Sequence, residues 1–90
     1  KAPVSYSLEQ NYPNPFNPET DISFTLAKSD NVTLKIYNIL GSEVVTLVNE
    51  FMEAGKHTIK FNAADLTSGV YLYTIKSGSF TATRKMILMK

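Results

Sequence analysis

Apolar and polar residues alternate with a period of two in a series of short segments along the chain. The apolar members of these segments are Ile22, Phe24 and Leu26, then Val32, Leu34 and Ile36, then Val45 and Leu47, Ile59 and Phe61, and Tyr71, Tyr73 and Ile75. Successive side chains of a strand point to opposite faces, so each segment predicts a β-strand with one apolar face. A further strand is expected over residues 80–89, after a tight turn at residues 77–79.

The remaining segments decide how many strands the chain can form. Residues 49–54 are compatible with one turn of helix, which Gly55 would end. Val4, Tyr6 and Leu8 alternate within residues 1–12, so this segment is expected to be a linker or a first edge strand. Six strands and a seventh at the N-terminus, without crossover helices or a repeat, favour an all-β fold: an Ig-like, seven-stranded antiparallel β-sandwich of Greek-key type.

Three prolines, Pro13, Pro15 and Pro18, interrupt this pattern within six residues. Each fixes its own φ and biases the preceding residue towards an extended conformation, so neither a helix nor a central strand is expected here. We call residues 11–18 the proline strap. The predicted organisation is a linker or first edge strand in residues 1–12, followed by an Ig-like domain in residues 13–90.

Length and charge narrow the classes of function. Ninety residues, of which 43% are hydrophobic and 19% charged, suit one globular domain. Nine basic and eight acidic residues are interspersed, giving a net charge of +1, so neither nucleic acid nor an anionic membrane is an expected partner. No apolar run approaches the ~20 residues that span a bilayer, and membrane insertion is therefore not expected.

Cysteine content and the first ten residues bear on disulfides, metal sites and export. It has no cysteine, which excludes disulfides and thiolate metal sites. Residues 1–10 lack the apolar core of a signal peptide, and the chain begins with lysine. The lysine start fits a domain of a longer protein, and if that protein is exported, its export signal lies upstream.

Few residues are candidates for chemistry. His57 is the sole histidine and is expected to be a solvated strand residue rather than a base or ligand. Glu19 and Asp21 would share one face of a strand and could hold calcium, but such a site usually takes about six to eight oxygen ligands. We expect no catalytic residue, no metal and no cofactor, and hence no enzyme.

Five tyrosines and five phenylalanines raise a carbohydrate-binding reading, in which an aromatic strip stacks on sugar rings. Phe24, Phe61, Tyr71 and Tyr73 fall on the apolar parity of their strands, which favours core packing. The alternation does not assign Tyr6 or Tyr37 to either the core or the surface.

Five segments together resemble a known family. They are residues 12–20 (YPNPFNPET), 36–41 (IYNILG) with Val44 after it, 55–57 (GKH), 66–71 (LTSGVY) and 85–90 (KMILMK). In this register they resemble the type A C-terminal sorting domain of the type IX secretion system of Bacteroidetes and related bacteria. The likeness runs from about residue 11 to residue 90.

The resemblance implies a seven-stranded Ig-like domain that sorts a covalently linked N-terminal cargo. Such domains cross the inner membrane on a separate signal, pass through the periplasm and direct the cargo through an outer-membrane translocon. A surface sortase then removes the domain, leaving the cargo at the cell surface or secreted. The implied partners are the translocon, shuttle and sortase proteins of the type IX system.

Three regions are candidates for recognition by these partners. The residues are Pro13, Asn14, Pro15 and Phe16 in the strap, Gly69, Val70 and Tyr71 at a corner, and Lys85, Ile87, Met89 and Lys90 in the last strand. The strap could dock its phenylalanine over an open end of the sandwich, and the corner tyrosine could bond back to backbone near Asp65. The last strand, at an edge, could pair with a receptor by strand addition.

Three other functions stay open. The Pro-Asn-Pro and Gly-Val-Tyr segments also resemble the Ig-like domain of flagellar hook-capping proteins, although those usually show Trp-Asp-Gly where this chain has Phe61-Asn62-Ala63. A carbohydrate-binding module of a secreted hydrolase and a structural spacer are the others, since one fold hosts many roles.

Overall fold

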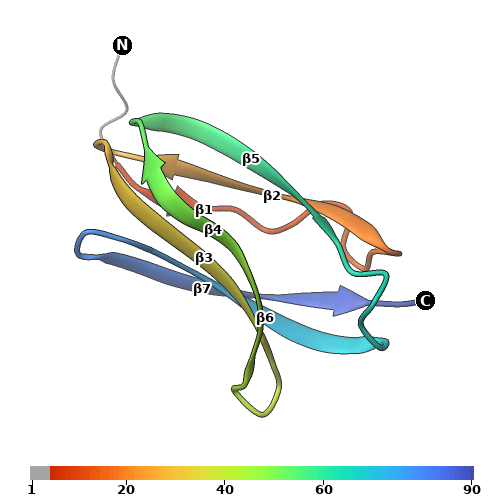
Figure 1. The fold of residues 1–90 in the computed structure, drawn as a ribbon. Coiled ribbons are helices and arrows are strands. Elements are labelled where there is room, and N and C mark those ends of the chain that lie inside the picture. Colours follow the sequence, from red (N-terminus) through yellow and green to blue (C-terminus); the bar gives the residue numbers. More distant parts are fainter. Residues whose placement is uncertain (1–4) are drawn as a thin grey trace.

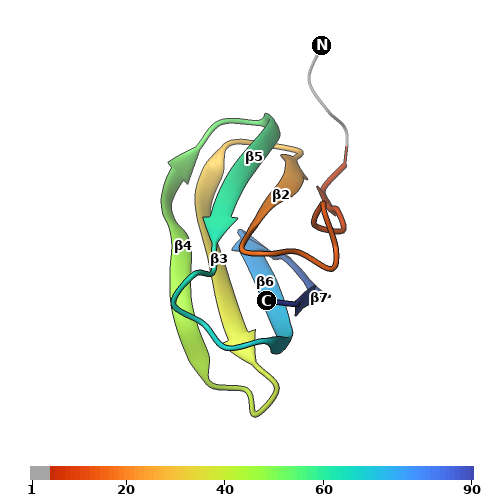
Figure 2. The same cartoon turned by 90° about the vertical axis from the view of Figure 1, so that its right-hand side faces the viewer.

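The chain folds into two stacked β-sheets. The computed structural model describes residues 5–90, so Val4 of the predicted N-terminal segment lies outside the described part. The strands are β1 (Ser7–Leu8), β2 (Glu19–Leu26), β3 (Asp30–Asn38), β4 (Glu43–Met52), β5 (Gly55–Asn62), β6 (Gly69–Ser77) and β7 (Phe80–Leu88). One sheet has the order β1-β2-β5 and the other β4-β3-β6-β7, with antiparallel pairing throughout (Figures 1 and 2). The predicted all-β, Ig-like sandwich of seven antiparallel strands is confirmed.

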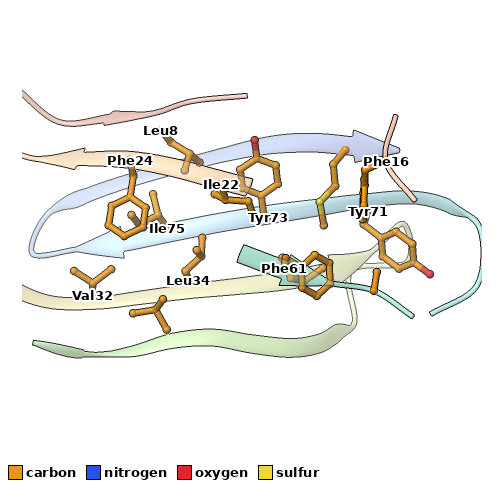
Figure 3. Packing of buried hydrophobic residues seen from close by; sticks show 14 of the residues in the cluster. Leu8, Phe16, Ile22, Phe24, Val32, Leu34, Phe61, Tyr71, Tyr73 and Ile75 are labelled. Carbon is orange, nitrogen blue, oxygen red and sulfur yellow. The ribbon is translucent and has the colours of Figure 1, made fainter. Parts of the chain in front are cut away.

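The core fills the space between the sheets with the apolar faces that the alternation predicts. Phe24 of β2, Leu34 of β3 and Tyr73 of β6 are fully buried and lie between the two layers (Figure 3). Phe61 and Tyr71 are also buried, so the aromatic residues assigned to the core are there. A carbohydrate-stacking strip cannot use these rings, because they face inward.

Strand β4 differs from the prediction in two ways. Its pairing with β3 slips twice, since Leu34 pairs with Val48 but Lys35 with Thr46, and Ile36 with Val45 but Tyr37 with Glu43. Each slip inserts an extra residue, as in a β-bulge, and shifts which side chains face the core. Val48 is therefore buried, whereas Val45 and Leu47 are only partly so. The helical turn expected at residues 49–54 is wrong, because the strand continues to Met52.

The proline strap crosses from one sheet to the other. The short strand β1 pairs with β2 through Ser7 with Thr25 and Leu8 with Phe24. The chain then runs past the edge of β7 before it returns as β2 (Figure 1). The tight turn predicted between the last two strands is present, with Ser77 paired to Phe80 across two residues.

Tyr73 joins the start of the strap to the core. Its hydroxyl accepts a hydrogen bond from the Asn11 N–H (2.8 Å) and donates one to the Glu9 carbonyl (2.7 Å). Burial raises the pKa of this hydroxyl above its ordinary value of 10.0, and this effect outweighs the Asn11 N–H and the Arg84 guanidinium, which act in the opposite direction.

This environment predicts a tyrosine-linked loss of stability at alkaline pH. The folded state binds the phenolic proton more tightly than the unfolded state, so the stabilisation is complete below pH 10 and disappears as the pH rises through the raised pKa. Urea unfolding between pH 8 and 11 should therefore show a steeper alkaline decline for the wild type than for Tyr73→Phe. Parallel declines would contradict the assignment.

Candidate recognition surface

The strap is attached to the end of β7 by its phenylalanine. The Phe16 N–H donates to the Ile87 carbonyl and the Met89 N–H donates to the Phe16 carbonyl, each at 3.0 Å. This forms a parallel bridge between Phe16 and Leu88. The Phe16 ring is 2% exposed and lies 6.2 Å from the Phe61 ring, between centroids. Phe16 closes one end of the core, so its side chain is not available to a partner.

Two polar side chains occupy further backbone groups on the same edge. The Asn14 Oδ1 accepts a hydrogen bond from the Ile87 N–H (2.9 Å), and the Gln10 Nε2 donates to the Lys85 carbonyl (2.7 Å). An added strand would need these same groups. The expected strand addition at the end of β7 therefore does not hold for this structure, because the chain itself already occupies the edge there.

The two faces of β7 have different environments. Met86 and Leu88 point into the core and are buried, whereas Lys85 is exposed, Ile87 is half-buried, and Met89, one residue past the end of the strand, is exposed. Alternate residues therefore face the core and the solvent, and the outer set is the one that contains the candidate residues. At the end of this strand the outer face is accessible, whereas the backbone edge is occupied by the chain itself.

The corner before β6 lies beside this strand end. The Tyr71 hydroxyl donates to the Thr67 carbonyl at 2.7 Å, so the tyrosine bonds back to backbone as expected, two residues after Asp65. Tyr71 itself is 6% exposed. Gly69 pairs with Leu88 and Val70 with Ile87, while the Lys90 N–H donates to the Ser68 Oγ at 3.0 Å. Lys90 also donates from its side chain to the Ala64 carbonyl.

The fold thus brings the three candidate regions together at one end of the sandwich. Hydrogen bonds and strand pairing join the strap to β7, and β7 to the corner. The predicted residues that remain accessible are Pro13, Asn14, Pro15, Gly69, Val70, Lys85, Met89 and Lys90, with Ile87 partly so. Phe16 and Tyr71 are buried and hold the surface in place. We call the accessible set the strap–corner surface.

Sequence reasoning left one neighbour of this surface, Tyr37, unassigned and missed the others. On the outer face of the four-stranded sheet, Tyr37 pairs with Leu72 and Leu72 with Lys85, forming one row across three strands. Beyond β3, the turn carries Ile39 and Leu40, which are 71% and 86% exposed. The alternation of β3 and β6 contained the signal for Tyr37 and Leu72, since both stand on the parity opposite to the core.

The residues considered for chemistry have ordinary partners. The His57 Nε2 lies 2.7 Å from the Glu53 carbonyl oxygen. The Lys60 Nζ lies 3.9 Å from a Glu19 carboxylate oxygen and 3.6 Å from one of Asp21, placing a cation where calcium was considered. Within residues 5–90 no group of three or more potential metal ligands occurs, and no helix could cross a membrane.

Comparison with known proteins adds a family to this geometry. Residues 10–89 match a family model described as the secretion system C-terminal sorting domain, which is a family of sorting signals rather than of enzymes. No curated protein matches the sequence.

Among solved structures, the chain is similar to PorZ, described as an essential bacterial surface component of the type IX secretion system of Porphyromonas gingivalis. The TM-score is 0.62 and the identity 21%, over 90% of this chain but 11% of the PorZ chain, so this likeness supports the fold alone. The family match covers nearly all of the sequence and confirms the resemblance carried by its motifs. The chain belongs to the secretion system C-terminal sorting domain family.

Proposed function

We propose that this domain carries a covalently linked N-terminal cargo from the periplasm to the type IX outer-membrane translocon and is afterwards removed by a surface sortase. Membership of the family implies an exported protein that moves to the cell surface in association with the type IX system. The translocon, shuttle and sortase proteins are the proposed partners, and the strap–corner surface is the proposed contact.

One observation carries this proposal: segments far apart in the sequence form one exposed surface on a rigid base. Asn14 contacts the backbone of Ile87, 73 residues later, and Val70 pairs with the same residue. Buried Phe16 and Tyr71 hold these segments, so a partner meets a surface that is already ordered. Binding to a preorganised surface avoids most of the entropy cost of ordering it.

The position at which the chain enters the domain supports the same function. Tyr6 stacks on Phe80 with ring centroids 4.7 Å apart, and Phe80 pairs with Ser77, which pairs with Val32 near the start of β3. The corner and Asn38 lie at the other end of β3 and β6. A cargo joined before Tyr6 would therefore approach the end opposite the corner and leave the strap–corner surface accessible.

Fusion of residues 1–90 to a periplasmic reporter tests the proposal. In a strain with the type IX machinery the fusion should reach the cell surface and lose the domain, as measured by protease accessibility and by the mass of the surface reporter. The control is the same fusion in an isogenic strain without the translocon, where it should stay periplasmic. Periplasmic retention in both strains would refute the function.

A further inference from the structure

The turn between β3 and β4 exposes two large apolar side chains beyond the rest of the sandwich. This hairpin tip, residues 38–42, projects past the neighbouring strand ends in both ribbon views (Figures 1 and 2). Ile39 is 71% exposed and Leu40 is 86% exposed. Because these two side chains are exposed, they add nothing to the core. Packing within the domain therefore does not explain why apolar residues occupy these two positions.

The tip is nevertheless rigidly built. The Asn38 Oδ1 accepts hydrogen bonds from the N–H groups of Leu40 (2.9 Å) and Ser42 (3.0 Å). The backbone of Asn38 also bonds to Ser42 and Gly41, and Gly41 takes a φ of 86°, a conformation that favours glycine. The two apolar side chains therefore stand on an ordered base, which lowers the entropy cost of inserting them into a partner.

A hollow of about 200 Å³ lies beside the tip and is part of the same surface. Its walls are Asn38 and Ile39 on one side and residues 67–71 on the other. Val70, 37% exposed, forms an apolar wall opposite Ile39, and Gly69 has open space where a side chain would stand. The hollow therefore suits an apolar side chain contributed from outside.

The two sheets differ in how their charged side chains are paired, and the four-stranded sheet is the one that continues into the tip. On the three-stranded sheet, Lys56 lies 3.5 Å from Glu9, and Lys60 has the two acidic neighbours given above. On the outer face of the other sheet, Lys35 is paired with Glu43 at 3.2 Å, and Thr46 and Lys35 lower the pKa of that carboxyl. Within the described chain, no carboxylate lies within 4 Å of Lys85, which stands in the row of Leu72 and Tyr37 beside the tip, or of Lys76, which faces Thr33 further along β3. A partner with carboxylates would complement this face.

We propose that the hairpin tip and its hollow bind a protein of the secretion machinery through an apolar pocket bordered by carboxylates. This rests on the proposed function and adds a second contact to the strap–corner surface. A protein fits better than an anionic lipid surface, because the nine basic and eight acidic residues of the chain are interspersed and leave a net charge of only +1.

The test compares Ile39→Ser/Leu40→Ser with Phe51→Ser in the reporter fusion. Phe51 is also apolar and 62% exposed, but pairs with Asn31 at the opposite end of β3. The tip variant should lower the rate of surface delivery about tenfold, as expected for apolar hot-spot residues, whereas the control should deliver normally. Both variants should keep the wild-type thermal midpoint.

A photo-crosslinking residue at position 40 should give an adduct with a type IX component, and one at position 51 should not. Lys85→Glu should weaken that adduct, and Lys56→Glu should not. Normal delivery of the tip variant, equal loss with Phe51→Ser, or binding of the domain to anionic vesicles in place of an adduct would overturn the inference. If the wild-type fusion itself stays periplasmic, the proposed function fails instead.

Discussion

Replacing Phe16 by alanine is expected to lower the free energy of unfolding by about 3–5 kcal/mol. The ring is 2% exposed and packs beside Phe61, so its removal loses buried apolar surface and leaves a cavity. The same residue joins the strap to β7 through its backbone. Because small domains have only about 5–15 kcal/mol of stability, the urea midpoint should fall steeply.

The matched control for this change is Tyr12→Ala in the same strap. Tyr12 is an aromatic residue of similar size but is 81% exposed, so its truncation should cost less than about 0.5 kcal/mol. Amide hydrogen exchange gives a second measurement: Met89, whose N–H donates to Phe16, should exchange faster in Phe16→Ala. Equal urea midpoints for the two variants would contradict the conclusion that Phe16 closes one end of the core.

The regular strands could be predicted because their burial follows local alternation. In β3, Val32, Leu34 and Ile36 face the core without interruption, and the sequence pattern is the same. In β4 the two slips beside Lys35 and Tyr37 change the parity within one strand. Alternation with a period of two does not predict where such slips occur, because they depend on the partner strand rather than on the residues of β4.

The strap shows a different limit. Its prolines predict an extended segment without helix, but its position depends on hydrogen bonds to residues more than seventy positions away. The spacing of neighbouring residues does not predict contacts over this range. These contacts overturn the expected strand addition at the edge of β7. An edge strand with alternating apolar residues is expected to have a free backbone edge, yet here Gln10 and the strap occupy that edge from Lys85 to Met89.

Within the candidate regions, the sequence did not separate accessible residues from supporting ones. Val70 and Met89 are accessible, while Phe16 and Tyr71 are buried, as the docking of Phe16 and the core parity of Tyr71 predict. Ile39 and Leu40 belong to the segment 36–41 that carries the family resemblance, and nothing in the sequence marks them as exposed. Apolar character alone does not reveal exposure, because the same residue type fills cores and presents binding surfaces.

The two faces of β7 allow stability and recognition to be separated by one kind of substitution. Met86→Ala is expected to lower the free energy of unfolding by about 2–5 kcal/mol, because Met86 is fully buried. Met89→Ala removes the same atoms three residues later, where the side chain is 59% exposed, and should cost less than about 1 kcal/mol. Urea unfolding of the two variants measures both values.

Surface delivery of the reporter fusion should rank these two variants in the opposite order to their stability. Met89→Ala keeps the fold but removes an exposed side chain of the strap–corner surface, so delivery should fall while the unfolding midpoint stays near the wild-type value. Met86→Ala should reduce delivery only in proportion to its unfolded fraction, and growth at lower temperature should restore it. If delivery followed stability alone in both variants, the outer face of β7 would have no part in recognition, and the strap–corner surface would have to be redrawn around the strap and the corner.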